Sequence, residues 1–315
     1  MPQAPHTPIL IAGPTASGKS ALALRIAEAL NGVVINADAM QVYRELRVLS
    51  ARPSPDDECR APHWLYGHVP AHEAYSTGRY LRDVAEVLQR ANTRGSRLIF
   101  VGGTGLYFKA LLGGLSPVPD IAADVRERWR AEAQRVGATV LHAQLAARDA
   151  EMAQRLAPGD TQRITRALEV LDATGRSLAE WQGIKGVPLL GATPTVRLVL
   201  RPDRKDLVAR CDARLDQMMA DGALDEVRAL VAAGLDPKLP AMGALGVVPL
   251  AAYLRGEIDL TAAVDRAKLE TRQYVKRQLT WLKRNMISWT SADLEEIGTN
   301  DRSIKQFIEC CAAIP

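Results

Sequence analysis

The stretch Gly13-Pro14-Thr15-Ala16-Ser17-Gly18-Lys19-Ser20 decides the fold of this chain. It matches the phosphate-loop pattern G-x-x-x-x-G-K-[ST], follows the apolar run 8–12 and precedes a helical pattern at 21–30. A strand, a glycine-rich turn and a helix in this order form a cradle of backbone N–H groups for phosphate. Lys19 adds a positive charge, and the Ser20 hydroxyl can reach a magnesium ion. The motif predicts phosphate binding but leaves the phosphate compound open.

Strands and helices alternate after this loop. Apolar runs at 33–36, 97–101 and 196–200 predict buried strands. Helices are expected from Ser76 or Thr77 to about 93, at 106–112, from the cap Asp203 to about 219, and from Asp221 to about 233. This alternation predicts an α/β fold, a doubly wound parallel sheet with a phosphate loop. Residues 52–73 read as a long polar stretch.

The helical pattern of the middle of the chain lacks a convincing strand. We therefore expect a P-loop catalytic core with C-terminal helices at 1–114 and 193–315, and a helical insertion at 115–192. A last amphipathic helix, at about 261–283, carries basic residues suited at best to a backbone-phosphate platform. Its apolar residues indicate that it also packs in the core: Leu269, Tyr274, Leu279 and Leu282.

The composition is that of an ordinary soluble protein. The 315 residues are 47% hydrophobic and 24% charged, with a formal net charge of +4, which allows a polyanionic partner without requiring one. The four cysteines form no C-x-x-C pair, which argues against structural zinc and for reduced thiols: Cys59, Cys211, Cys310 and Cys311. The first seven residues lack a secretory pattern, and no apolar run is long enough to span a membrane. We expect a cytoplasmic protein, most simply a monomer.

Several segments together resemble the tRNA dimethylallyltransferase family, bacterial type. The resemblance rests on the phosphate loop and on segments that follow it in the family's order: Ala37–Tyr43, Val101–Tyr107, Gln162–Val170, Thr174–Ser177 and Thr271–Trp281. It implies transfer of a dimethylallyl group from dimethylallyl diphosphate to the N6 amine of the adenosine 3′ to the anticodon in tRNA, with release of diphosphate. The implied partners are the tRNA anticodon stem-loop, dimethylallyl diphosphate and Mg²⁺.

The resemblance also implies roles on the donor side. Residues Gly13, Pro14, Thr15, Ala16, Ser17, Gly18, Lys19 and Ser20 would hold the diphosphate, with Ser20 as the metal ligand. Arg214 matches the family's diphosphate-binding arginine; taken alone, it could be a solvated helix charge. Thr104 matches a position that touches the substrate site; taken alone, it could be a helix N-cap.

Asp38 is the predicted general base. An exocyclic adenine amine is a poor nucleophile that must lose a proton as the new bond forms, so a nearby carboxylate is its natural partner. Two other interpretations stay open, a metal ligand at a strand end and a cap for a helix from Ala39.

The resemblance implies tRNA contacts in both parts of the chain, because the target base must be flipped out of a structured loop. These residues are Asp38, Ala39, Met40, Gln41, Thr104, Arg126, Gln162, Arg163, Ile164, Thr165 and Arg166. Without the resemblance, the arginines would read as a solvated basic face.

One residue departs from the family's pattern. Gly243 stands where the family usually has an arginine in a tRNA-contacting segment, which predicts weaker tRNA affinity with the chemistry retained.

Three rival functions remain at this stage. They are a small-molecule P-loop kinase that binds ATP, an adenylate isopentenyltransferase that uses a free nucleotide, and a P-loop protein that binds RNA without modifying it.

Overall fold

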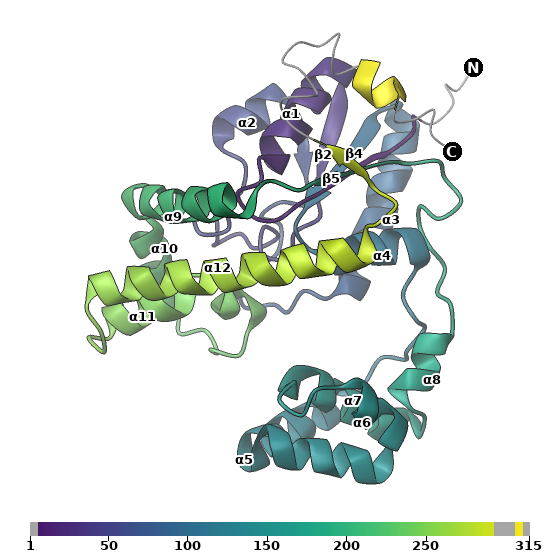
Figure 1. Ribbon diagram of the computed structural model, residues 1–315, viewed down its shortest axis with the longest axis vertical. Coiled ribbons are helices and arrows are strands. Elements are labelled where there is room, and N and C mark those ends of the chain that lie inside the picture. The colour runs from purple at the N-terminus through teal and green to yellow at the C-terminus, as the bar shows by residue number, and fades with distance from the viewer. Residues whose placement is uncertain (1–5, 293–305, 311–315) are drawn as a thin grey trace. The chain divides into compact units, whose positions relative to one another are not determined.

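A six-stranded parallel sheet forms the centre of the larger part of the molecule (Figure 1). The computed structural model describes residues 6–292 and 306–310. The strands are β1 (Ile9–Ala12), β2 (Gly32–Asn36), β3 (His63–Trp64), β4 (Arg97–Gly102), β5 (Val196–Leu200) and β6 (Thr290–Ala292). Their order is β3-β2-β4-β1-β5-β6, with every neighbouring pair parallel. The predicted α/β fold is confirmed.

Both faces of the sheet are buried, because successive side chains of a strand point to opposite sides. Ile9 and Ile11 of β1 pack in one apolar cluster with α1 (Lys19–Leu30), while Leu10 and Ala12 belong to a second cluster. The second cluster includes residues of α3 (Thr77–Arg94), α4 (Gly105–Gly113) and the helices after β5. Helices on both faces explain why the strands read as continuous apolar runs.

The helices after β5 pack beside one another (Figure 1). They are α9 (Arg204–Ala220), α10 (Ala223–Ala232), α11 (Val247–Leu254) and α12 (Leu260–Asn285), with a short 3₁₀ turn at Pro240–Gly243. Asp203 caps α9 as predicted, since its side chain accepts a hydrogen bond from the Lys205 N–H at 2.7 Å. The long helix α12 contacts both α9 and α11.

Gly113–Pro188 forms a separate compact unit. It holds α5 (Ala123–Arg148), α6 (Ala150–Arg155), α7 (Thr161–Thr174) and α8 (Leu178–Gly183) around its own core, which includes Leu141, Ile164 and Leu168. Gly137 kinks α5, with φ 76° and ψ 170°. The insertion predicted at 115–192 thus overlaps a unit with a core of its own, and its proposed role in tRNA binding stays a prediction.

Several local predictions were wrong. Asp221 does not begin a helix: it follows α9 as its C-cap, and α10 starts after Gly222, whose φ of 99° favours glycine. The polar stretch 52–73 contains α2 (Pro55–Arg60), which Ser54 and Asp57 close with a capping box. Leu269 is 52% exposed, so it is not a core residue of α12.

The cysteines and the helix lengths bear on two further expectations. Cys59, Cys211 and Cys310 are free thiols, and Cys311 lies outside the described residues. Residues 1–5, part of the segment predicted to lack a secretory pattern, also lie outside them. Over residues 6–292 and 306–310, no helix combines the length and the apolar character that a membrane crossing requires.

Candidate active site

The phosphate loop joins β1 to α1 in the geometry that the motif predicts. Ala16 and Gly18 lie in the left-handed region, with φ 59° and 85°, and such turns curl the backbone so that its N–H groups converge on an anion. A Cβ on Gly13 would lie 2.7 Å from Ser17 Oγ, so the loop needs glycine there. The Ser17 hydroxyl is buried and has no hydrogen-bond partner among the described residues. Its unmet hydrogen bond fits a phosphate ligand.

A cavity of about 330 Å³ opens beside this loop. It is lined by residues 16–21 and Leu24, by Ala51, Arg52, Pro53, Asp57 and His63, and by Arg214. Lys19 Nζ donates to the Pro14 carbonyl at 3.1 Å. Burial lowers the pKa of Lys19 to about 8, while the charge of Asp38 works in the opposite direction and that of Arg214 adds to the lowering. Lys19 is therefore a weakly solvated cation that still carries its proton at neutral pH.

Arg214 reaches the same loop from α9. Its Nη1 donates to Thr15 Oγ1 at 3.3 Å. Burial lowers the pKa of Arg214, but a guanidinium keeps its charge in proteins. The structure thus brings Arg214 to the phosphate loop, and the interpretation as a solvated helix charge is wrong. Two desolvated cations at one cradle favour a multiply charged anion.

Asp38 lies just beyond β2, held by the fully buried Asn36. Asn36 Oδ1 accepts the Asp38 N–H at 2.8 Å, and Asn36 Nδ2 donates to the carbonyls of Asp38 and Leu65, each at 3.0 Å. Asp38 Oδ1 accepts the Met40 N–H at 2.9 Å. A Cβ on Gly103 would lie 3.3 Å from Asp38 Oδ2, which places that oxygen beside the turn after β4. The carboxylate is fixed by its own turn, with Oδ2 next to Gly103.

The surroundings of Asp38 exclude one of its three interpretations, the helix cap. The chain after Ala39 forms turns, and the next helix along it is α2, so Asp38 does not cap a helix from Ala39. Burial, and after it the negative charge of Asp38, raise the pKa of Tyr66, Tyr107 and Tyr274. These tyrosines therefore keep their protons. Over the described residues there is no cluster of three His, Cys, Asp or Glu side chains that could hold a metal ion.

Thr104 connects the turn after β4 to the turn after β2. Its Oγ1 accepts the Ala39 N–H at 2.9 Å, and its own N–H donates to the Ala37 carbonyl at 3.3 Å. Because Oγ1 serves as an acceptor here, its O–H proton can be donated to a ligand. The strand order β2-β4-β1 therefore places Asp38, Thr104 and the phosphate loop at the carboxyl ends of three adjacent strands, where open α/β sheets bind ligands.

Gln278 is a site residue that the sequence reasoning missed. It is buried on α12, accepts the Thr15 N–H at 2.9 Å through Oε1, and donates to the Gly103 carbonyl at 3.1 Å through Nε2. The sequence feature that could have identified it is a polar side chain on the same helix face as the buried Val275 and Leu282. Trp281, one turn further on, packs so closely on Gly105 that a Cβ there would lie 2.2 Å from its ring.

The predicted tRNA contacts next to Asp38 lie on one loop. Ala39 and Met40 are half-buried, and Gln41 donates through Nε2 to the Ser50 and Ala51 carbonyls at 3.0 and 2.8 Å. Gln41 thereby holds the loop that lines the phosphate cavity. Its predicted contact with tRNA stays a prediction.

The predicted tRNA contacts in the helical unit differ in exposure. Gln162 and Arg163 are exposed, and Arg166 pairs with Glu169 at 3.3 Å. Ile164 is fully buried in the helical core and Thr165 nearly so, and their assignment to the tRNA-binding segment stays a prediction. Arg126 turns its guanidinium to the Ile121 carbonyl, at 2.9 and 2.6 Å.

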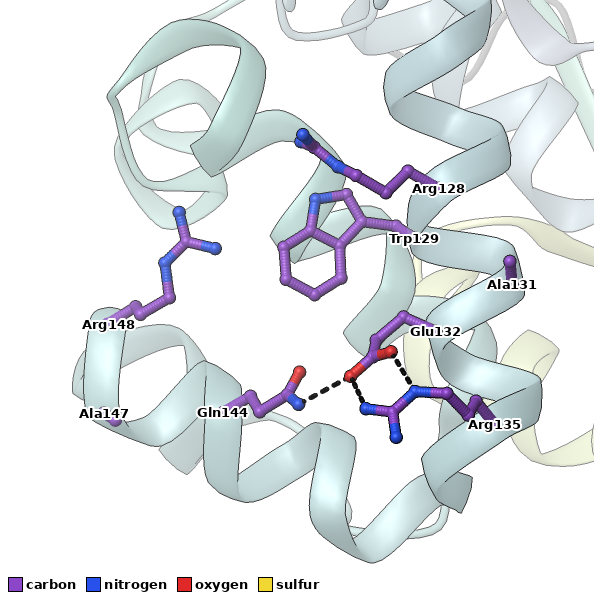
Figure 2. A pocket seen from close by; sticks show the side chains of 8 residues that line it. All are labelled: Arg128, Trp129, Ala131, Glu132, Arg135, Gln144, Ala147 and Arg148. Atoms are coloured by element: carbon purple, nitrogen blue, oxygen red, sulfur yellow. Dashed lines mark hydrogen bonds and ion pairs between the residues drawn. The ribbon is translucent and has the colours of Figure 1, made fainter.

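The helical unit also carries a cavity of about 700 Å³, shown in Figure 2. Trp129 and Glu132 line it from α5 before the kink, and Gln144 and Arg148 line it from α5 after the kink. Glu132 accepts from both Arg135 and Gln144, and Arg148 and the Trp129 indole both donate to Asp172. Its polar groups are paired with one another. We therefore place the chemistry at the phosphate loop.

Comparison with known proteins identifies the family of the chain. The IPP transferase family model matches residues 41–285. Proteins named tRNA dimethylallyltransferase are 53% identical in Mesorhizobium japonicum, over 88% of this chain and 86% of the relative, and 51% identical in Methylocella silvestris, over 94% and 98%.

Solved structures are similar over nearly the whole chain. A tRNA isopentenylpyrophosphate transferase from Bacillus halodurans has 29% identity and a TM-score of 0.68, covering 97% of this chain and 96% of its own. A eukaryotic dimethylallyltransferase described as acting on tRNA has 27% identity and a TM-score of 0.77, covering 96% of this chain and 80% of its own. The family model spans more than half of the chain, and relatives more than half identical cover most of it. The chain therefore belongs to the IPP transferase family, together with these tRNA dimethylallyltransferases.

Proposed function

We propose that this protein transfers a dimethylallyl group from dimethylallyl diphosphate to the N6 amine of the adenosine 3′ to the anticodon in tRNA. The observation that carries the proposal is that two kinds of site lie at the carboxyl ends of strands separated only by β4. A cationic phosphate cradle follows β1, and a fixed carboxylate, Asp38, follows β2. Prenyl transfer needs both, since a diphosphate must leave and an amine must lose a proton.

The donor side is the phosphate loop with Lys19 and Arg214. As the carbon–oxygen bond breaks, negative charge grows on the departing diphosphate, and the loop's N–H groups and the two cations stabilise it. A smaller cavity of about 50 Å³ adjoins the other side of Arg214 and Thr15, lined by Leu49, Leu215, Met218 and Leu245 among others. Polar residues also line this cavity, among them Ser50 and Thr271.

Magnesium fits the oxygen atoms at this cradle. Mg²⁺ takes few protein ligands and several substrate oxygens, and the Ser20 hydroxyl lines the phosphate cavity at the start of α1. Bound there, the ion would neutralise charge on the diphosphate.

The acceptor side is Asp38 with Thr104. The carboxylate takes the proton that the adenine amine loses, and its position is fixed by Asn36 and the Met40 N–H. We assign recognition of the anticodon stem-loop to the exposed Gln162, Arg163 and Arg166, with Arg126 at the start of α5. A cytoplasmic location and a monomeric state remain expectations from the sequence.

One assay separates the rival functions. The pure protein is incubated with dimethylallyl diphosphate, Mg²⁺ and bulk tRNA, and digested nucleosides are analysed by mass for prenylated adenosine. AMP replaces tRNA in a second reaction, and ATP with no donor is followed for hydrolysis in a third. Prenylation of tRNA alone supports the proposal, whereas modified AMP or ATP turnover without tRNA modification contradicts it. Lys19→Ala serves as the inactive control.

A further inference from the structure

Gln278 is a buried amide that joins the two loops of the site. Only 7% of its surface is exposed, and it lies on the inner face of α12 between Val275 and Leu282. A buried amide is costly unless both its oxygen and its nitrogen find partners. Two partners of Gln278 are backbone groups of the loops, the Thr15 N–H at 2.9 Å and the Gly103 carbonyl at 3.1 Å, and the Tyr274 side chain of the same helix is a third partner.

Each end of this bridge continues into a residue with a proposed chemical role. On the donor side, Thr15 Oγ1 accepts from Arg214 at 3.3 Å. On the acceptor side, Gly103 precedes Thr104, whose hydroxyl accepts the Ala39 N–H beside Asp38. A series of hydrogen bonds therefore runs from Arg214 through Gln278 to the turn that holds Asp38.

The turn after β4 is shaped to admit this side chain. A Cβ on Gly103 would lie 2.3 Å from Gln278 Nε2, so any larger residue would push the amide out. On Gly102 it would lie 2.0 Å from the Ala37 carbonyl oxygen, so the turns after β2 and β4 touch directly. The phosphate loop reaches the same turn through Gln278.

We propose that Gln278 is a positioning residue that sets the spacing between the diphosphate cradle and the acceptor turn. This inference rests on the proposed function, because spacing matters only if donor and acceptor react across it. Transfer requires the leaving oxygen, the carbon and the attacking nitrogen to be aligned at near-contact distance, and a misplacement of about 1 Å costs roughly 100-fold in rate. The hydrogen bonds of Gln278 to the two loops end on backbone groups, so it acts through the loops.

The test replaces Gln278 by methionine, which keeps the length of the side chain and removes both hydrogen bonds to the loops. We expect Gln278→Met to lower kcat for tRNA prenylation by roughly 30-fold, with the KM values for dimethylallyl diphosphate and tRNA within about 3-fold of wild type. The matched control is Gln273→Met, at an exposed glutamine of the same helix, which should leave kcat and both KM values unchanged. Melting temperatures are recorded for every variant.

A second variant separates the two bonds. Gln278→Glu retains an acceptor for the Thr15 N–H but turns a carboxylate oxygen toward the Gly103 carbonyl. We expect the affinity for inorganic diphosphate, measured by calorimetry, to stay within about 2-fold of wild type while kcat falls as in the methionine variant.

Three results would overturn the inference: an unchanged kcat in both variants, a raised KM at unchanged kcat, or a loss of activity that only follows a loss of folded protein. A wild-type protein that prenylates no tRNA would instead contradict the proposed function. The diphosphate titration does not depend on turnover and keeps the two failures apart.

Discussion

The carboxyl edge of the sheet and the surface of the helical unit hold their polar side chains in opposite ways. At the sheet edge, backbone groups are hydrogen-bonded by the side chains of Asn36, Thr104 and Gln278. These hydrogen bonds fix the loops that carry the reacting side chains. On α7, Arg163 and Arg166 pair only with Asp160 and Glu169 of the same segment, at 3.5 and 3.3 Å. The Arg163–Asp160 pair is exposed on the arginine side and is worth at most about 1 kcal/mol, whereas in the second pair the Glu169 carboxylate is buried. The side chains at the sheet edge are held in fixed positions, whereas the arginines of α7 can exchange their carboxylate partners for other anions.

The largest effect should follow from Asp38→Asn in the sheet region. The amide oxygen can still accept the Met40 N–H, so the turn keeps its shape, but the side chain no longer accepts a proton. We expect single-turnover transfer to slow by roughly 100-fold or more at unchanged tRNA affinity. Rapid-quench kinetics measure the rate. An unchanged rate would show that Asp38 is not the general base, and that a fixed side chain at the sheet edge matters no more for transfer than an exposed one on the helical unit.

Lys19 should make donor binding depend on pH. In the free protein its pKa is about 8, because burial disfavours the charged form. A bound diphosphate favours that form and raises the pKa, so above pH 8 binding must take up a proton. Affinity for inorganic diphosphate should therefore fall by up to about 10-fold per pH unit between 8 and 10. Calorimetry across this range measures it.

The matched variant for this titration is Lys19→Arg, which stays charged throughout. Its pH dependence reports only the ionisation of diphosphate itself. If diphosphate affinity fell equally with pH in the two proteins, diphosphate binding would not be linked to the protonation of Lys19.

A smaller effect is expected on the helical unit. Arg163→Ala should weaken tRNA binding by roughly 3- to 10-fold and reduce the slope of log affinity against log salt by about 1, because one phosphate contact is lost. Arg255→Ala, at an exposed arginine of the larger unit that pairs with Glu257, is the control. Filter binding at several salt concentrations measures both. If the two variants behave alike, α7 does not contact the RNA.

The smallest effect concerns Gly243. Its φ is not positive, it is exposed, and a Cβ on it would meet no atom within 4 Å among the described residues, so the glycine is not required by the backbone. Gly243→Arg should add about 1 kcal/mol of tRNA affinity, roughly 5-fold, at an unchanged melting temperature. Unchanged affinity would show that the family's arginine position makes no RNA contact in this protein.

Sequence patterns predicted the parts of the molecule that local chemistry specifies. The phosphate loop, the strand of Ile9–Ala12 and the cap Asp203 follow from residues close to one another in the chain. The helix α11 (Val247–Leu254) escaped prediction because its N-cap is Gly246, with φ 87°, and because it contains Pro249. Gln278 escaped because its partners in the loops lie 263 and 175 residues away, and no local pattern encodes such a contact. Arg214 was assigned only through the family resemblance.

The two connections of the helical unit run together where they meet the sheet unit. The Leu190 N–H donates to the Leu111 carbonyl at 2.9 Å, and a Cβ on Gly114 would lie 2.5 Å from the carbonyl carbon of Gly186. The chain thus leaves and returns at nearly one point. The entropy of closing such an excursion grows only with the logarithm of its length. Because the two connections lie so close together, a change in the length of the inserted segment need not alter the path of the chain through the sheet.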